Sequence, residues 1–86
     1  MTIKPAIVKR LLQICDTRKM PANDLAVRSG ITPSTVYSLL QDNRKDMSVI
    51  TLKKLCDGLE MSLVEFFDSD VFRELEQEVT LDSMMT

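Results

Sequence analysis

Hydrophobic residues recur every three or four positions along most of the chain, which is the spacing of one face of an α-helix. The first such stretch predicts an amphipathic helix over about residues 4–18, with Pro5 tolerated in its first turn. Its apolar positions are Ile7, Val8, Leu11, Leu12, Ile14 and Cys15. No stretch alternates with the two-residue period of a strand.

Two short helices follow, joined by a tight turn. Pro21 opens the first, which runs through ANDLAVRS and stops at Gly30, a residue that can take the left-handed conformation after a helix end. Thr32 is the expected N-cap of the next helix, and Pro33 suits its first position, where the missing N–H costs nothing. Its inward residues are Val36, Leu39 and Leu40.

The rest of the chain predicts three more helices. Ser48 is the expected cap of a fourth, and Ser62 with Glu65 forms a capping box that opens a fifth, SLVEFF. Asp68 or Asp70 would cap a short sixth helix, VFRELEQEV. The three phenylalanines at helical spacing are expected in the core, with a dimer contact as the alternative for Phe72; they are Phe66, Phe67 and Phe72. The predicted fold is all-α.

The third predicted helix differs from the others in its composition. The chain is 28% charged, yet residues 32–41, TPSTVYSLLQ, carry no charge. A solvated helix would place lysine and glutamate on its outer face, and a buried helix would carry fewer hydroxyls. The outer face of this helix is therefore expected to meet a partner that penalises charge.

Charge is divided sharply along the sequence. Residues 1–56 hold ten basic and four acidic side chains, a net charge of +6, whereas residues 57–86 have a net charge of −8. The overall charge of −2 hides this asymmetry, which indicates an anion-binding body followed by an acidic segment.

Catalytic and metal chemistry find little support in the composition. The chain has no histidine, so His-based triads and general bases are excluded, and Cys15 and Cys56 lack the spacing of metal ligands. The two thiols are interpreted as reduced core residues. We expect neither an enzyme nor a cofactor or metal site. No apolar run is long enough to cross a membrane, and a cytoplasmic location is expected.

Two short helices joined by a glycine turn, the second polar and uncharged outside, are typical of a helix-turn-helix unit. The segments LAVRSGITPSTVYSLL and SVITLKKLCDGLEMSLVEFF resemble the Cro/phage-repressor-type helix-turn-helix regulators, also called the xenobiotic-response-element family. The similarity covers about residues 6–68. It implies a compact five-helix DNA-binding domain over 1–68, with residues 69–86 as an acidic C-terminal helix and tail.

The resemblance also assigns DNA contacts. It places four residues of the helix 33–41 at base edges in the major groove: Pro33, Ser34, Tyr37 and Ser38. It assigns phosphate contacts to Arg28, Thr35, Gln41, Arg44, Lys45 and Ser48, with free backbone N–H groups after Ser48 adding to them. Small hydroxyls and one aromatic ring suit a groove floor of donors, acceptors and methyl groups.

Five positions depart from the family pattern. Pro21-Ala22 replaces a common Ser-Gln whose glutamine reaches a phosphate, and Pro33 replaces a common glutamine. Asp42 and Glu60 stand where glycines usually follow the third and fourth helices, so left-handed backbone there would be strained. These departures affect the contacts more than the fold.

The sequence predicts a double-stranded-DNA-binding transcriptional regulator, a repressor that acts as a homodimer on a pseudo-palindrome. Two alternatives stay open at this point. One is an antitoxin-like protein that shares the DNA-binding body and binds a partner protein through residues 70–86. The other is a protein-interaction module that has lost DNA binding, for which Pro21-Ala22 and Pro33 are the main support.

Overall fold

The computed structural model describes residues 1–41 and 46–79, and this part of the chain is helical without a strand. Five α-helices and one 3-10 turn follow one another: α1 (Ile3–Arg18), α2 (Ala22–Ser29), α3 (Pro33–Leu40), α4 (Val49–Gly58), α5 (Leu63–Phe67) and η1 (Asp70–Phe72). The all-α prediction and the five predicted helices are confirmed, with bounds within a few residues of those expected.

The expected sixth helix is much shorter than the sequence indicates. Only η1 forms, with Ser69 accepting a hydrogen bond from the Val71 backbone N–H, and the described residues after Arg73 are not helical. The prediction of a helix continuing to Val79 is wrong. The segment instead turns back to the N-terminus and the start of α1. The Glu76 backbone N–H donates to the Met1 carbonyl at 3.1 Å, and the Glu78 side-chain Oε2 accepts from the Ile3 N–H at 2.9 Å.

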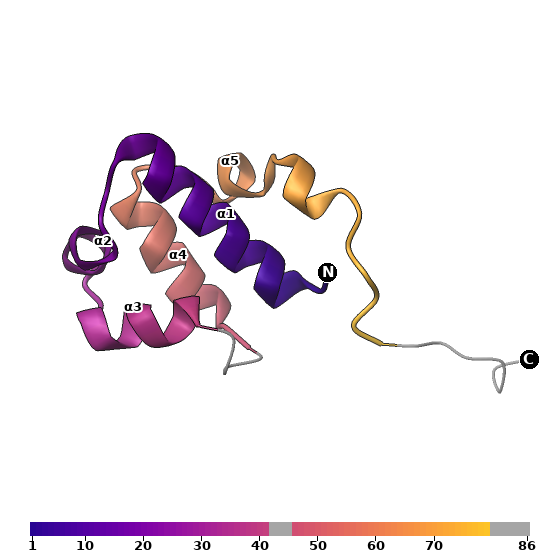
Figure 1. Cartoon of the computed structure of the whole chain (residues 1–86), viewed down its shortest axis with the longest axis horizontal. Helices are drawn as coiled ribbons and strands as arrows, with labels where there is room; N and C mark the ends of the chain where they lie inside the picture. Colours follow the sequence, from indigo (N-terminus) through magenta and orange to yellow (C-terminus); the bar gives the residue numbers. More distant parts are fainter. Residues whose placement is uncertain (42–45, 80–86) are drawn as a thin grey trace, which may run out of the picture.

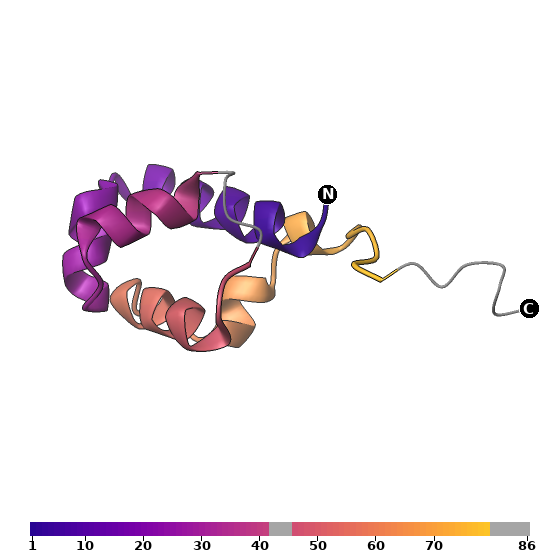
Figure 2. The ribbon, with the colours of Figure 1, turned by 90° about the horizontal axis from the view of Figure 1, so that it is seen from below.

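The helices surround one core, in which α1 lies across α2 and α4 while α3 lies at the outer edge (Figure 1). Seen from below, α3 again lies at the surface, on the side away from α5 and η1 (Figure 2). Every α-helix contributes to the core, and the largest fully buried side chains are Phe66, Leu11, Leu25, Leu55, Leu59, Val36 and Cys56. Leu12, expected inside, is half exposed.

The three phenylalanines behave differently from one another. Phe66 is fully buried, Phe72 is half-buried against the core, and Phe67 is exposed at 38%. Their ring centroids lie 4.8–5.8 Å apart, which joins α5 to η1. The expectation of a core position is confirmed for Phe66, holds in part for Phe72, and is wrong for Phe67.

The predicted helix starts are correct in position. Ser48 accepts a hydrogen bond from the Thr51 N–H at 3.0 Å, and the capping box of Ser62 and Glu65 is present in both directions. Thr32 is the N-cap of α3, but its hydroxyl does not bond the backbone of that helix. It bonds the Thr35 hydroxyl at 2.7 Å instead.

Three helices end with a residue in the left-handed region, and only one of these residues is glycine. Gly30 after α2 has φ of 68°, whereas Lys19 after α1 and Glu60 after α4 have φ of 53° and 55°. The left-handed backbone expected at Glu60 is therefore present, and Lys19 is a second, unpredicted instance. The fate of Asp42 lies outside the described residues.

Replacing Glu60 with glycine should raise the free energy of unfolding by about 1 kcal/mol, because glycine adopts positive φ without the steric cost that other residues incur. Chemical denaturation would measure this change. Glu60→Ala is the matched control, since it removes the same exposed carboxylate and keeps the Cβ. An equal gain in both variants would mean that charge, rather than backbone strain, is the cause.

Helices α2 and α4 approach each other closely at Gly58. A Cβ placed on Gly58 would overlap the Ser29 hydroxyl and would stand 3.0 Å from the Ser29 backbone nitrogen. Ser29 is itself buried, and its Oγ has no hydrogen-bond partner among the described residues. Only glycine therefore lets α4 lie this close to the end of α2.

Three cations of α1 hold the ends of other helices. Lys4 Nζ donates to the Gln41 carbonyl at 3.3 Å after α3, and Arg18 Nη1 donates to the Leu59 carbonyl after α4. Arg10 donates to two carbonyls of α5, from Nε to Phe66 at 2.8 Å and from Nη2 to Glu65 at 3.1 Å. These bonds give carbonyls at or just after the ends of α3, α4 and α5 a partner on α1. The Glu65 carbonyl also accepts from the Asp68 N–H at 3.3 Å.

Both cysteines are free thiols, as predicted, with Cys56 buried and Cys15 partly so. Burial raises the pKa of each thiol. The positive charge of Arg18 offsets only part of this rise at Cys15, and that of Lys53 only part of it at Cys56. Since the thiolate is the reactive form, both are expected to react slowly.

Across residues 1–41 and 46–79, none of the helices has the length and apolar character needed to cross a bilayer.

Candidate nucleic-acid interface

The α2–α3 pair is joined by a turn of three residues with defined hydrogen bonds. The Gly30 N–H donates to the Val27 carbonyl at 3.3 Å, and the Ile31 N–H donates to the Ala26 carbonyl at 3.0 Å. Gly30 adopts the left-handed conformation, which reverses the chain direction. Ala26 is fully buried, and its small side chain lets the neighbouring helices pack closely. The turn thus presents α3 at the molecular surface with its Val36 and Leu39 inside.

The outer face of α3 is polar, uncharged and open. Pro33, Ser34 and Tyr37 are exposed, the last at 50%, and Ser38 is half-buried. All four residues that the resemblance assigns to base edges therefore lie on α3, with Pro33, Ser34 and Tyr37 accessible. Tyr37 is the one large side chain among them, and it projects an aromatic ring with a hydroxyl from a face of small residues.

Hydroxyl groups are linked at the start of α3. Thr32 Oγ1 lies 2.7 Å from Thr35 Oγ1 and 3.5 Å from Ser34 Oγ. Thr35, expected at a phosphate, is half-buried and already has a protein partner. A hydroxyl can donate and accept at once, so these residues keep hydrogen-bonding capacity for a ligand.

Gln41 and Ser48 flank the segment between α3 and α4. Gln41 is exposed, and its backbone carbonyl is held by Lys4, which leaves the amide side chain outside. Ser48 donates to Thr51 Oγ1 at 2.8 Å and accepts from the Thr51 N–H, so its hydroxyl serves the helix cap. The first N–H groups of α4, at Val49 and Ile50, have no hydrogen-bond partner among the described residues and are available to an anion.

The predicted cationic contacts are partly described. Arg28 is exposed on α2 and has no hydrogen bond or ion pair among the described residues. Arg44 and Lys45 lie outside the described residues.

The basic side chains of the first 56 residues are not equally available to a phosphate. Lys4, Arg10 and Arg18 bind carbonyls, and Lys53 pairs with Asp57 one helical turn away. In the described ranges, the cations without such partners are Lys9, Lys19, Arg28 and Lys54. Lys9, Lys19 and Lys54 are not among the residues predicted to contact DNA, since spacing in the sequence cannot separate a cation engaged within the fold from a free one.

Within residues 1–41 and 46–79, acidic and cysteine side chains form no cluster that could hold a metal ion. The polar surface of α3, together with the residues that flank it, is a candidate binding surface. The uncharged side chains of α3 can form hydrogen bonds with a ligand, and cations and backbone N–H groups lie beside them.

A family model described as Cro/C1-type HTH DNA-binding domain matches residues 10–70. No curated protein and no solved structure matches the chain. The matched span includes the whole of α2, the turn, α3, α4 and α5.

Proposed function

Because the chain belongs to the Cro/C1-type helix-turn-helix DNA-binding domain family, we propose that it regulates transcription by inserting α3 into the major groove of double-stranded DNA. The observation that carries this proposal is the exposed, uncharged face of α3. A charged helix would have to match each charge to one chosen base, whereas hydroxyls and an aromatic ring enter the groove at low desolvation cost.

In this arrangement Pro33, Ser34, Tyr37 and Ser38 face base edges. Serine hydroxyls bond several bases and discriminate weakly, so Tyr37 supplies most of the contact area through a hydrogen bond or packing on a thymine methyl group. The half exposure of Tyr37 and its position on the outer face support this role.

Phosphates are bound on either side of α3. We assign these contacts to Arg28, Thr35, Gln41, Arg44, Lys45 and the start of α4 after Ser48. The uncapped N–H groups of Val49 and Ile50 favour an anion there, since the helix dipole adds to their donors. Such contacts fix the register of the protein on DNA without reading its sequence.

One domain of this size makes few contacts, and we propose that two copies bind a pseudo-palindromic operator as a repressor. Two recognition helices one turn of DNA apart, about 34 Å, would read its half-sites. Support comes from α5, which exposes Val64 at 80% and Phe67 at 38% beside Leu63, an apolar surface that pairing would cover.

Selection of bound duplexes from a random DNA pool at two salt concentrations tests the proposal. An enriched inverted repeat with half-sites one helical turn apart is the expected result. Weak, salt-sensitive binding without an enriched motif would mean that the surface is electrostatic and does not read sequence. Absence of binding at low salt would overturn the proposed function.

Replacing Tyr37 with alanine should weaken binding to the selected site by about 1–3 kcal/mol, or roughly five- to 150-fold. Binding to unrelated DNA should change little, because the ring makes no phosphate contact. Fluorescence anisotropy on both duplexes measures the two affinities. Tyr37→Phe separates the hydroxyl from the ring, and equal losses on specific and unrelated DNA would contradict the base-contact role.

A further inference from the structure

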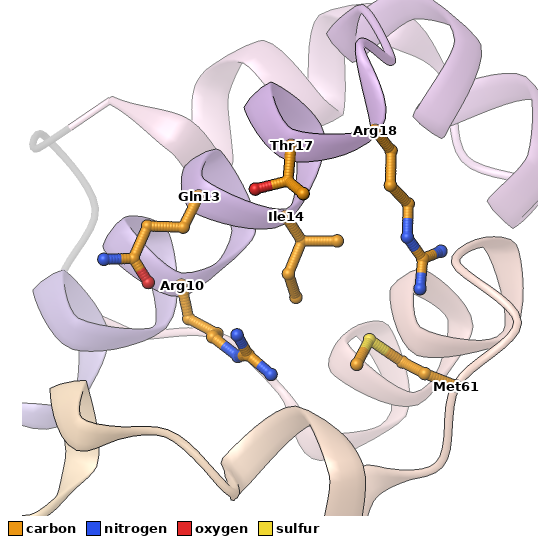
Figure 3. Close-up of a pocket in the computed structure, with 6 residues that line it drawn as sticks. All are labelled: Arg10, Gln13, Ile14, Thr17, Arg18 and Met61. Carbon is orange, nitrogen blue, oxygen red and sulfur yellow. The ribbon is translucent and has the colours of Figure 1, made fainter.

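A hollow of about 460 Å³ lies between α1 and the turn that connects α4 to α5, apart from the α3 face. It is lined by Arg10, Gln13, Ile14, Thr17, Arg18 and Met61. Figure 3 shows Arg10 and Arg18 extending from α1 toward the same space, with Ile14 between them and Met61 opposite. Its size falls within the range of small-molecule sites.

The two guanidinium groups are held in place and keep donors free. Arg10 uses Nε and Nη2 on the α5 carbonyls, which leaves Nη1, and Arg18 uses Nη1 on the Leu59 carbonyl, which leaves Nε and Nη2. Nothing else in the described part of the chain bonds these remaining nitrogens. A guanidinium fixed by backbone carbonyls is oriented in advance, so less side-chain entropy is lost when a ligand binds.

The charge of the hollow is uniformly positive. None of the described residues that line it is a carboxylate, and the nearby Glu65 uses its side chain to accept from the Ser62 N–H. Gln13 and Thr17 add uncharged donors at the wall, while Ile14 and Met61 provide apolar surface for a carbon chain. This combination fits an organic anion better than a bare inorganic ion.

The spacing of the two arginines indicates the kind of anion. Residues 10 and 18 are eight positions apart on α1, about 12 Å along the helix axis, and their flexible side chains converge across the hollow. We propose that the hollow binds a small organic dianion whose two acidic groups, carboxylate or phosphate, pair with Arg10 and Arg18 while its carbon chain lies on Ile14 and Met61.

Binding there would tie together the ends of two helices. Arg18 already holds the carbonyl end of α4 and Arg10 that of α5, so a ligand between them adds a third connection to α1. The ligand therefore stabilises the folded protein by an amount that rises with the logarithm of its concentration above the dissociation constant. This inference concerns ligand binding alone and does not rest on the function of α3.

Titration of the full chain with glutarate, adipate and 3-phosphoglycerate, followed by NMR of backbone amides and arginine Nε–H groups, tests the proposal. Acetate at matched ionic strength is the monoanion control. Saturable shifts of the Arg10 and Arg18 Nε–H signals with at least one dianion, and no such shifts with acetate, are expected. The dicarboxylate and phosphate probes show which acidic group is preferred.

Two variants and one control locate the site. Arg18→Gln should weaken the binding at least about tenfold. Thr17→Glu should do the same by placing a carboxylate in the hollow, and it leaves both arginines and their backbone bonds intact. Lys19→Gln removes an equal charge next to Arg18 without touching the hollow and should change the affinity less than about twofold.

Three results would overturn the proposal: no saturable shift with any dianion, equal affinity for acetate, or equal weakening by Lys19→Gln and Thr17→Glu. Circular dichroism of each variant confirms that the helices are retained. If Arg18→Gln loses helix content, Thr17→Glu alone decides the outcome.

Discussion

Replacing Gly58 with leucine should lower the free energy of unfolding by about 3 kcal/mol, an effect at the upper end of overpacking in a dense core. The new side chain would have to occupy space filled by Ser29 and by the backbone around Arg28, and backbone atoms cannot rotate away. Chemical denaturation measures the loss. Affinity for DNA should fall as well, since displacement of α2 moves the turn that positions α3.

A pair of smaller changes identifies the cause. Gly58→Ala should be destabilising by about 1–2 kcal/mol despite the higher helix propensity of alanine. Ser29→Ala removes a buried hydroxyl that has no partner among the described residues, so alone it should be neutral or stabilising. Combined, the two should recover most of the loss. Strict additivity of the two effects would show that Gly58 and Ser29 do not compete for space.

Replacing Phe66 with alanine should lower the free energy of unfolding by about 3–5 kcal/mol. The ring is fully buried, contacts the rings of Phe67 and Phe72, and carries the Arg10 guanidinium over its face at 5.9 Å. Its removal leaves a cavity between α5, η1 and α1 that the surrounding backbone can fill only in part. Denaturation by urea gives the change in stability.

Phe67→Ala provides the matched control, because the two residues are adjacent and lose the same atoms. Phe67 is 38% exposed, and its substitution should cost less than half as much as that of Phe66. Equal losses would contradict the assignment of Phe66 to the core and would point instead to the aromatic cluster as one unit.

Much of the fold was predictable because its signals are local. Hydrophobic spacing predicts the five α-helices. Ser48 and Ser62 predict where α4 and α5 begin, since an N-cap depends on residues only three positions apart. The positive φ at Glu60 followed from its position after a helix end. The sixth helix was mispredicted for the converse reason. The Glu76 backbone N–H and the Glu78 carboxylate bond Met1 and Ile3 at the N-terminus, and hydrophobic periodicity cannot reveal so distant a partner.

The candidate interface was predictable in outline and incomplete in detail. The uncharged composition of residues 32–41 indicated the face of α3, and the structure places that face at the surface. Which cations remain free could not be foreseen. Lys4, Arg10 and Arg18 look like any other basic residues in the sequence, and only the packing of α1 shows that they hold helix ends.

The bonds from α1 to these helix ends have a consequence for how the chain folds. They join residues 37 to 56 positions apart, so these bonds at the ends of α3, α4 and α5 form only after the first helix has docked. Such long-range contacts raise the contact order, so folding is slower than for a helical bundle whose contacts are mostly local. Folding is consequently expected to be a single all-or-none transition, with no stable intermediate in which residues 20–79 are structured and the first helix is not.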